Sequence, residues 1–269
     1  MTRPELPTSP IEAYDRSATA WATGADPAYR RFAEALLARA PSTWIGARVL
    51  DVAAGAGPLS LALRELGAEP VALDGAPSML AVARARVPGL PVLAGDALAL
   101  PLATSSLDGA AIGFCLNHVP EPWLLLAEAA RVVRAGGVVL ASTFERGVDH
   151  RAKDAVDDAA RAQGWQPSDW YVEFHDHARH SDTAALLSEC ALRAGLLDVS
   201  VTATDVDTGL ATSPALVAWR LGMPELAAFA RSLDVESRAT LVAAAVTALG
   251  PKPEPLVRRV LALVGRSPS

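Results

Sequence analysis

The sequence predicts an α/β fold built on a mostly parallel sheet of seven strands. Between residues 48 and 143, short apolar runs alternate with helix-length amphipathic segments, and short connections containing glycine and proline separate them. Parallel strands need crossover connections, and these place helices on both faces of the sheet. The chain has 269 residues, of which 51% are hydrophobic and 20% charged, so it can bury a core of that size.

The individual elements have local signals. Asp26 is a suitable N-cap with Pro27 at the first helical position, and Pro58, Pro77 and Pro122 can open helices in the same way. Strands are expected at 48–52, 70–73, 91–94, 108–114, 138–143, 198–204 and 255–264. Helices are expected at 26–37, 58–66, 77–86, 122–133 and 181–194, with helical insertions in 145–180 and in 213–249, the latter as two helices broken near Asp234.

Charge and cysteine content exclude several classes of protein. A net charge of −6 gives no overall attraction to nucleic acid or to anionic lipid, and no apolar run is long enough to span a membrane. The two cysteines cannot form a disulfide framework, and the N-terminal residues lack the apolar core of a signal peptide. We therefore expect a cytoplasmic protein without a nucleic-acid or membrane partner; a homodimer stays open.

Acidic and glycine residues follow the first three expected strands. Open parallel sheets bind ligands at the carboxyl ends of their strands, and Gly55 and Gly57 would let a ligand approach the backbone closely. Asp74 could accept hydrogen bonds from both ribose hydroxyls of an adenosine, and Asp96 could accept one from the adenine amine. Taken singly, each glycine could be a structural turn and each acid a solvated strand end.

Four stretches in this order resemble the class I S-adenosylmethionine-dependent methyltransferases, in the small-molecule branch of the ubiquinone and menaquinone biosynthesis (type 11) methyltransferases. They are 49–57, 72–80, 95–97, and 107–120 with 131–137. The resemblance implies a Rossmann-like doubly wound sheet with an antiparallel last strand. It also implies an N-terminal helical lid in 1–44 and a methyltransferase domain in 45–269.

The resemblance further implies a set of residues that bind S-adenosylmethionine. Gly55 and Gly57 would line its methionine part, Asp74 would hold the ribose, and Met79 would pack beside the adenine unless it is simply a core residue. The full set implied is Tyr14, Asp51, Ala53, Gly55, Gly57, Asp74, Gly75, Met79, Gly95, Asp96, Ala97 and Ile112. Ala53 stands where the family has its first motif glycine.

We expect the methyl acceptor to bind between the insertions at 145–180 and 213–249, which hold many of the aromatic residues of the chain. We expect Trp170, Phe174 and Trp219 to contact a small acceptor, together with Trp21 in the lid. Trp21 and Tyr14 could instead only attach the N-terminal helix to the body. His118, after the fourth strand, is the candidate base, although it could shape the site without moving protons.

No metal is expected. His175 and His177 could share one side of a strand, but no reliable third ligand accompanies them.

These features predict methyl transfer from S-adenosylmethionine to a small apolar or aromatic acceptor. O-methylation is favoured because a histidine could serve as base, and nitrogen and carbon acceptors stay open. One alternative is a protein of this fold that binds the cofactor without transferring a methyl group. A nicotinamide-dependent oxidoreductase fits poorly, because Ser60 replaces the third glycine of its fingerprint and no Tyr-x-x-x-Lys pair occurs.

Overall fold

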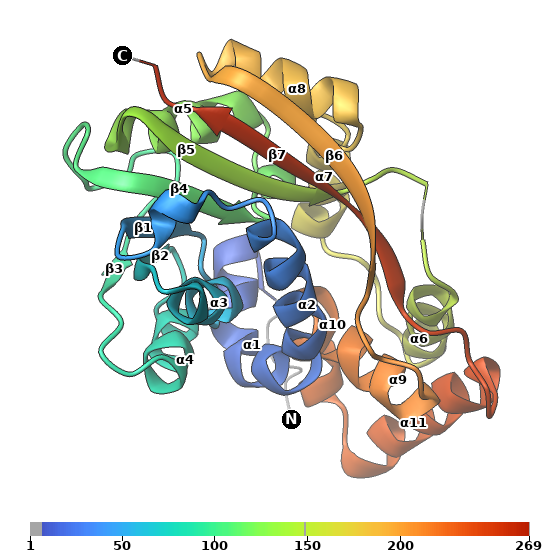
Figure 1. Cartoon of the computed structure of the whole chain (residues 1–269). Helices are drawn as coiled ribbons and strands as arrows, with labels where there is room; N and C mark the ends of the chain where they lie inside the picture. The colour runs from blue at the N-terminus through green and yellow to red at the C-terminus, as the bar shows by residue number, and fades with distance from the viewer. Residues whose placement is uncertain (1–6, 148, 269) are drawn as a thin grey trace.

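The computed structural model describes residues 7–147 and 149–268, and it confirms the predicted fold class. Seven strands form one sheet in the order β3-β2-β1-β4-β5-β7-β6 (Figure 1). All pairs from β3 to β5 are parallel, and β7 runs antiparallel to both of its neighbours. The strands are β1 Arg48–Val52, β2 Glu69–Asp74, β3 Val92–Ala94, β4 Leu107–Gly113, β5 Val133–Phe144, β6 Leu197–Asp207 and β7 Val257–Arg266.

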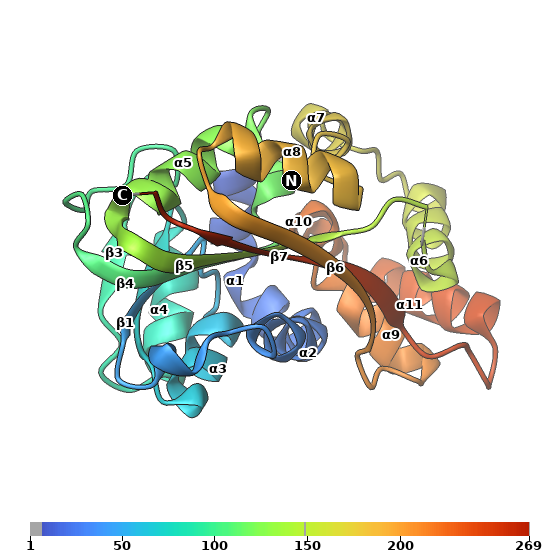
Figure 2. The same cartoon turned by 45° about the horizontal axis from the view of Figure 1, so that its top comes forward.

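Helices cover both faces of this sheet. In Figure 2, α5 and α8 lie on one side of the sheet, and α2 and α3 lie on the other. The helices are α1 Pro10–Gly24, α2 Asp26–Leu37, α3 Pro58–Leu66, α4 Pro77–Arg86, α5 Pro122–Val132, α6 Arg151–Ala162, α7 Asp169–Ala178, α8 Ala184–Arg193, α9 Ser213–Leu221, α10 Pro224–Ser232 and α11 Val235–Leu249. None of the helices in the described ranges is long and apolar enough to cross a membrane.

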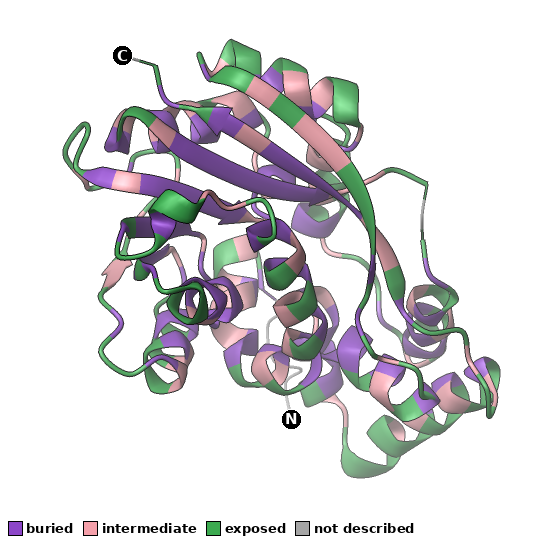
Figure 3. Cartoon of the chain, viewed as in Figure 1, coloured by how far each residue is buried: buried purple, intermediate pink, exposed green. Residues whose placement is uncertain are grey.

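Alternating side chains of the central strands enter separate cores. In β1, Leu50 and Val52 pack with α5 residues such as Leu125, whereas Val49 packs on the opposite face with Leu63 of α3. Both faces are therefore apolar, as expected for a parallel sheet between two helical layers. Figure 3 shows the central strands as buried, while the edge strand β6 is largely exposed or intermediate.

A separate helix, α1, precedes the helix at 26–37 that the residue pattern predicts, and it lies within the helical lid that the resemblance implies. Ser9 caps it by accepting a hydrogen bond from the backbone N–H of Glu12, and Pro10 occupies the first turn. Helix α1 packs against α2, α4, α9 and α10, so it connects the sheet domain to the C-terminal insertion. Residues 1–6 of the predicted lid lie outside the described part of the chain.

The second insertion contains three helices rather than two. The expected break at Asp234 is present, because Asp234 caps α11, and a further break separates α9 from α10. Gly222 follows α9, and a Cβ at this position would come within 2.8 Å of the Ala20 carbonyl oxygen of α1. Pro224 then opens α10. The break itself falls at Met223, which is extended with a ψ of 142° because the residue before a proline is disfavoured in the helical region.

Candidate active site

The turn from β1 to α3 approaches a cavity with its backbone. Ala53, Gly55 and Gly57 all have positive φ angles of 55°, 54° and 81°. A Cβ at Gly55 would meet no heavy atom within 4 Å, so this position is open. A Cβ at Gly57 would lie 3.0 Å from Cβ of Ala83, so this glycine allows α3 to pack on α4. Gly55 is thus the position where a ligand can reach the backbone.

Two carboxyl groups stand at the ends of β1 and β2. Asp74 accepts hydrogen bonds from the N–H groups of Gly55 (2.7 Å) and Ala76 (2.8 Å), and Asp51 accepts one from the Ser60 hydroxyl (2.6 Å). Burial raises the pKa of Asp51 to about 7, with Ser60 opposing and Asp74 adding to the rise. Burial also raises the pKa of Asp74, against the three backbone N–H groups that favour its charged form.

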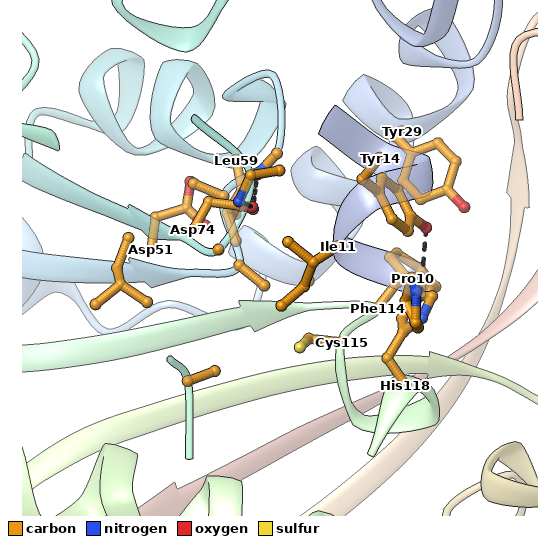
Figure 4. A pocket seen from close by; sticks show the side chains of 18 of the residues that line it. Pro10, Ile11, Tyr14, Tyr29, Asp51, Leu59, Asp74, Phe114, Cys115 and His118 are labelled. Atoms are coloured by element: carbon orange, nitrogen blue, oxygen red, sulfur yellow. Dashed lines mark hydrogen bonds between the residues drawn. The ribbon is translucent and has the colours of Figure 1, made fainter. Parts of the chain in front are cut away.

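A cavity of about 310 Å³ lies above these groups. In Figure 4, Asp51 and Asp74 lie on one side of it, His118 on the other, and Ile11 of α1 between them. Most of the predicted residues line this cavity, namely Tyr14, Trp21, Asp51, Ala53, Gly55, Asp74, Gly75, Gly95, Asp96, Ala97 and His118. The structure therefore brings together the motifs of the first three strands and the N-terminal helix.

Three predicted residues stand behind the cavity wall. Gly57, Met79 and Ile112 are not among its lining residues. Met79 and Ile112 are fully buried, in two different core clusters. These residues therefore support the cavity wall from behind. Trp21, which was predicted to contact the acceptor, lines this first cavity instead.

Tyr14 and His118 meet between this cavity and a second one. The Tyr14 hydroxyl lies 3.3 Å from Nε2 of His118, and the two rings contact edge to face. Burial lowers the pKa of His118 to about 4, with a smaller effect of nearby His177, so the imidazole is neutral at pH 7. Its Nδ1 has no hydrogen-bond partner among the described residues.

The second cavity has a volume of about 700 Å³ and is lined by the insertions. Trp170, Phe174 and Trp219 line it, and Phe174 also packs against His118 with ring centroids 4.7 Å apart. Four residues line both cavities: Tyr14, Tyr29, Phe114 and His118. The two cavities are therefore neighbours that share one wall.

Sequence reasoning missed several residues of the second cavity. They include Tyr29, Asn117, Phe144, Lys153 and Arg258. A signal for Arg258 existed: an antiparallel last strand begins at the edge where the parallel strands end. Val260 pairs with Phe144 at the end of β5, so Arg258 lies just beyond that edge.

A buried ion pair holds the insertions together. Arg220 of α9 donates to both carboxylate oxygens of Asp157 in α6 (2.7 and 3.0 Å) and to the Tyr171 hydroxyl in α7 (3.1 Å). It also pairs with Glu225 of α10. Both side chains of the Arg220–Asp157 pair are 3% exposed. This network positions the walls of the second cavity.

The histidine-rich segment forms a helix, not the strand considered from sequence. His175 and His177 lie on α7, where residues two positions apart face different directions. Across residues 7–147 and 149–268, no group of three histidine, cysteine or acidic side chains could hold a metal ion.

Comparisons with known proteins agree with this geometry. Residues 50–141 match a methyltransferase domain family. A demethylmenaquinone methyltransferase from Parafrankia sp. is 35% identical over 210 residues, which cover 68% of this chain and 81% of that protein. The chain belongs to the class I S-adenosylmethionine-dependent methyltransferases. A second demethylmenaquinone methyltransferase, from Renibacterium salmoninarum, is 46% identical over 99 residues. This match covers 37% of this chain and only 42% of the length of that relative.

Several solved structures have the same fold as this chain at low sequence identity. Phosphoethanolamine N-methyltransferase 2 of Haemonchus contortus, in complex with phosphomonomethylethanolamine and S-adenosylhomocysteine, has a TM-score of 0.54 at 18% identity, covering 88% of this chain and 52% of that one. The [4+2]-cyclase SpnF has a TM-score of 0.54 at 18% identity, covering 89% and 81%. These likenesses concern the fold.

The first cavity fits the family's cofactor, S-adenosylmethionine. The Gly55 position is open, and Asp74 is a carboxylate at the end of β2, suited to a ribose. Asp96 is exposed at the end of the β3 segment, where its side chain can meet an adenine edge. Tyr14 and Ile11 of α1 close the cavity from the other side.

Proposed function

We propose that the protein transfers the methyl group of S-adenosylmethionine to a small, largely apolar or aromatic acceptor. The observation that carries this proposal is the shared wall between the two cavities, at Tyr14 and His118. One cavity has the acids and open glycine that suit the cofactor, and the other has the aromatic side chains that suit an acceptor. For methyl transfer, the acceptor atom would have to reach the sulfonium methyl group beside these shared residues.

In the first cavity, side chains and backbone of the protein would bind and orient S-adenosylmethionine. Asp74 would hold the ribose, the backbone at Gly55 would face the methionine part, and Asp96 with Ala97 would meet the adenine. Bound S-adenosylmethionine supplies an electrophilic methyl group on a sulfonium. Because the reaction is an in-line displacement, much of its rate can come from positioning the two partners.

On the acceptor side, we favour O-methylation with His118 as the proton acceptor. The acceptor oxygen forms a bond to the methyl carbon, the S–C electron pair returns to sulfur, and the hydroxyl proton leaves. Nδ1 of His118 has no partner among the described residues and is free to take that proton when Nε2–H donates to the Tyr14 oxygen. A neutral imidazole with a pKa of about 4 is too weak a base to ionise the free hydroxyl. It would orient the hydroxyl and take its proton as the new O–C bond makes that oxygen acidic.

The test is product analysis with S-adenosylmethionine and a panel of phenols and quinols, including demethylmenaquinone, which the curated relatives' names give as their substrate. S-adenosylhomocysteine formed one-to-one with a methylated acceptor would support the proposal. Tight cofactor binding without any methylated product would instead favour a non-methylating role of the same fold. The position of the new methyl group decides between oxygen, nitrogen and carbon.

A further inference from the structure

Three buried side-chain N–H donors, each without a hydrogen-bond partner among the described residues, belong to residues that line the second cavity. They are Nε1 of Trp170, Nε1 of Trp219 and Nε of Arg258. The two tryptophan residues are only 6% and 7% exposed. Buried donors are almost always paired, because leaving one unpaired costs about 1–3 kcal/mol. A ligand with acceptor atoms in this cavity would have these three donors as its nearest unsatisfied partners.

Arg258 is the charged member of this set. It lies at the start of β7 with its guanidinium 4.5 Å from the ring centroid of Phe144, and its side chain is 12% exposed. Its nearest carboxylate, on Asp149, is 3.8 Å away and belongs to a side chain that is 72% exposed. Burial lowers the pKa of Arg258, and Asp149 and Tyr29 only partly oppose this. Among the described residues, the counter-charge of this cation is therefore a long contact with a largely exposed carboxylate.

The other acidic side chains of this cavity already have partners. Glu225 pairs with Arg220, Asp182 with Arg146 in a two-bond contact, and Glu145 with Arg259. None of them is left to neutralise Arg258. A buried cation of this kind is strongly disfavoured unless an anion joins it.

We infer that the methyl acceptor carries a carboxylate, which pairs with Arg258. The indole N–H groups of Trp170 and Trp219 donate hydrogen bonds to oxygen atoms of the same molecule. The inference rests on the proposed function, since it describes the substrate of that site. Phe144 connects the two ends: it contacts the Arg258 guanidinium, and its ring packs at a tilt of 31°, with centroids 4.3 Å apart, against Phe114, which lines both cavities. The apolar body of the acceptor would lie along these rings, with its methylated end toward His118.

The experiment compares 2-naphthoate with 2-naphthamide, which have the same ring and differ in charge. Binding of each to the whole protein is measured by calorimetry, without S-adenosylmethionine, so no methyl transfer is required. We expect the acid to bind at least tenfold more tightly than the amide. Arg258→Met should abolish this preference, and Arg258→Lys should retain part of it.

Arg259→Met is the matched control. Arg259 is the next residue of β7, but it pairs with Glu145 and Asp205 and does not line the cavity. Its variant should keep the preference for the acid. Thermal unfolding of both variants checks that each is folded, and Arg258→Met should lose little stability because the ion pair that it removes is long and has a largely exposed partner.

Two results would overturn the inference: an acid that binds no more tightly than the amide in the wild type, or an equal loss of preference in both arginine variants. Either result would leave methyl transfer untouched. Conversely, failure to form any methylated product, with the carboxylate preference intact, would count against the proposed function alone.

Discussion

The Tyr14 hydroxyl lies 3.3 Å from Nε2 of His118, and this contact joins helix α1 to the turn after β4. Both residues line both cavities, so the contact stands where cofactor and acceptor would meet. It also engages Nε2 and leaves Nδ1 as the imidazole nitrogen without a hydrogen-bond partner among the described residues.

Removing the Tyr14 hydroxyl should weaken methyl transfer more than folding. Tyr14→Phe retains the ring and loses one hydrogen bond, so we expect kcat/KM for the acceptor to fall about tenfold, or about 1.4 kcal/mol. Tyr29→Phe is the control, since Tyr29 lines both cavities but makes no hydrogen bond to His118. Equal losses in the two variants would argue against a role for the Tyr14–His118 contact.

The stability of the protein should depend on the protonation of His118. Its pKa is lowered in the folded protein to about 4 from 6.5, so the unfolded chain binds more protons between these values. The free energy of unfolding of the wild type should therefore fall as the pH falls from 6.5 toward 4. At pH 5 we expect this loss to exceed that of His118→Gln by about 1–2 kcal/mol. Urea unfolding of both proteins at pH 5 and pH 7.5 measures this difference. Parallel pH profiles would contradict the lowered pKa.

The tryptophan residues of the second cavity should affect the acceptor and not the cofactor. Trp170→Phe and Trp219→Phe each remove one unpartnered donor while keeping an aromatic ring. We expect the KM of the acceptor to rise about fivefold to tenfold and the affinity for S-adenosylmethionine to stay within twofold. Trp44→Phe is a matched control, because the Nε1 of Trp44 is also unpartnered among the described residues but Trp44 lines neither cavity. Equal effects on cofactor and acceptor would indicate a purely structural role.

Gly57 should matter for packing rather than for contact with the cofactor. Alanine at this position would be strained by the φ of 81° and would press on Ala83. We expect Gly57→Ala to lower the free energy of unfolding by about 2–3 kcal/mol. Gly46→Ala, with φ 74° and open space, should lose only about 1 kcal/mol. Chemical denaturation of both variants separates the cost of backbone strain from the cost of crowding against Ala83. Similar losses in the free energy of unfolding would show that packing against α4 is unimportant.

The sheet and the first cavity could be predicted because their signals are local. Apolar runs of strand length, the glycines of 53–57 and the strand-end acids Asp74 and Asp96 all lie within a few residues of the elements they belong to. Parallel topology then brings the strand ends together at one edge. The start of α1 also had a local signal, Ser9 three residues before Glu12, although the residue pattern alone did not identify it.

The second cavity could be predicted only in part. Its walls come from α6, α7, α9 and the start of β7, which tertiary packing brings together, so the aromatic residues Trp170 and Trp219 were expected and Arg258 was not. The break before α10 was also missed, although Pro224 is a local signal for it. The need for a small residue at Gly222 had no such signal, because it comes from a close contact with Ala20 of α1, about 200 residues away in sequence. Residues that meet across such separations leave no periodic pattern.

The most direct test of the central claim is a calorimetric titration of S-adenosylmethionine into the wild type and into Asp74→Ala. We predict micromolar binding that Asp74→Ala weakens at least tenfold, about 1.4 kcal/mol. Asp108→Ala should bind like the wild type, since Asp108 accepts from the Arg48 N–H and does not line the cavity. No binding by the wild type, or equal affinities for the wild type and Asp74→Ala, would contradict the assignment of the first cavity to the cofactor.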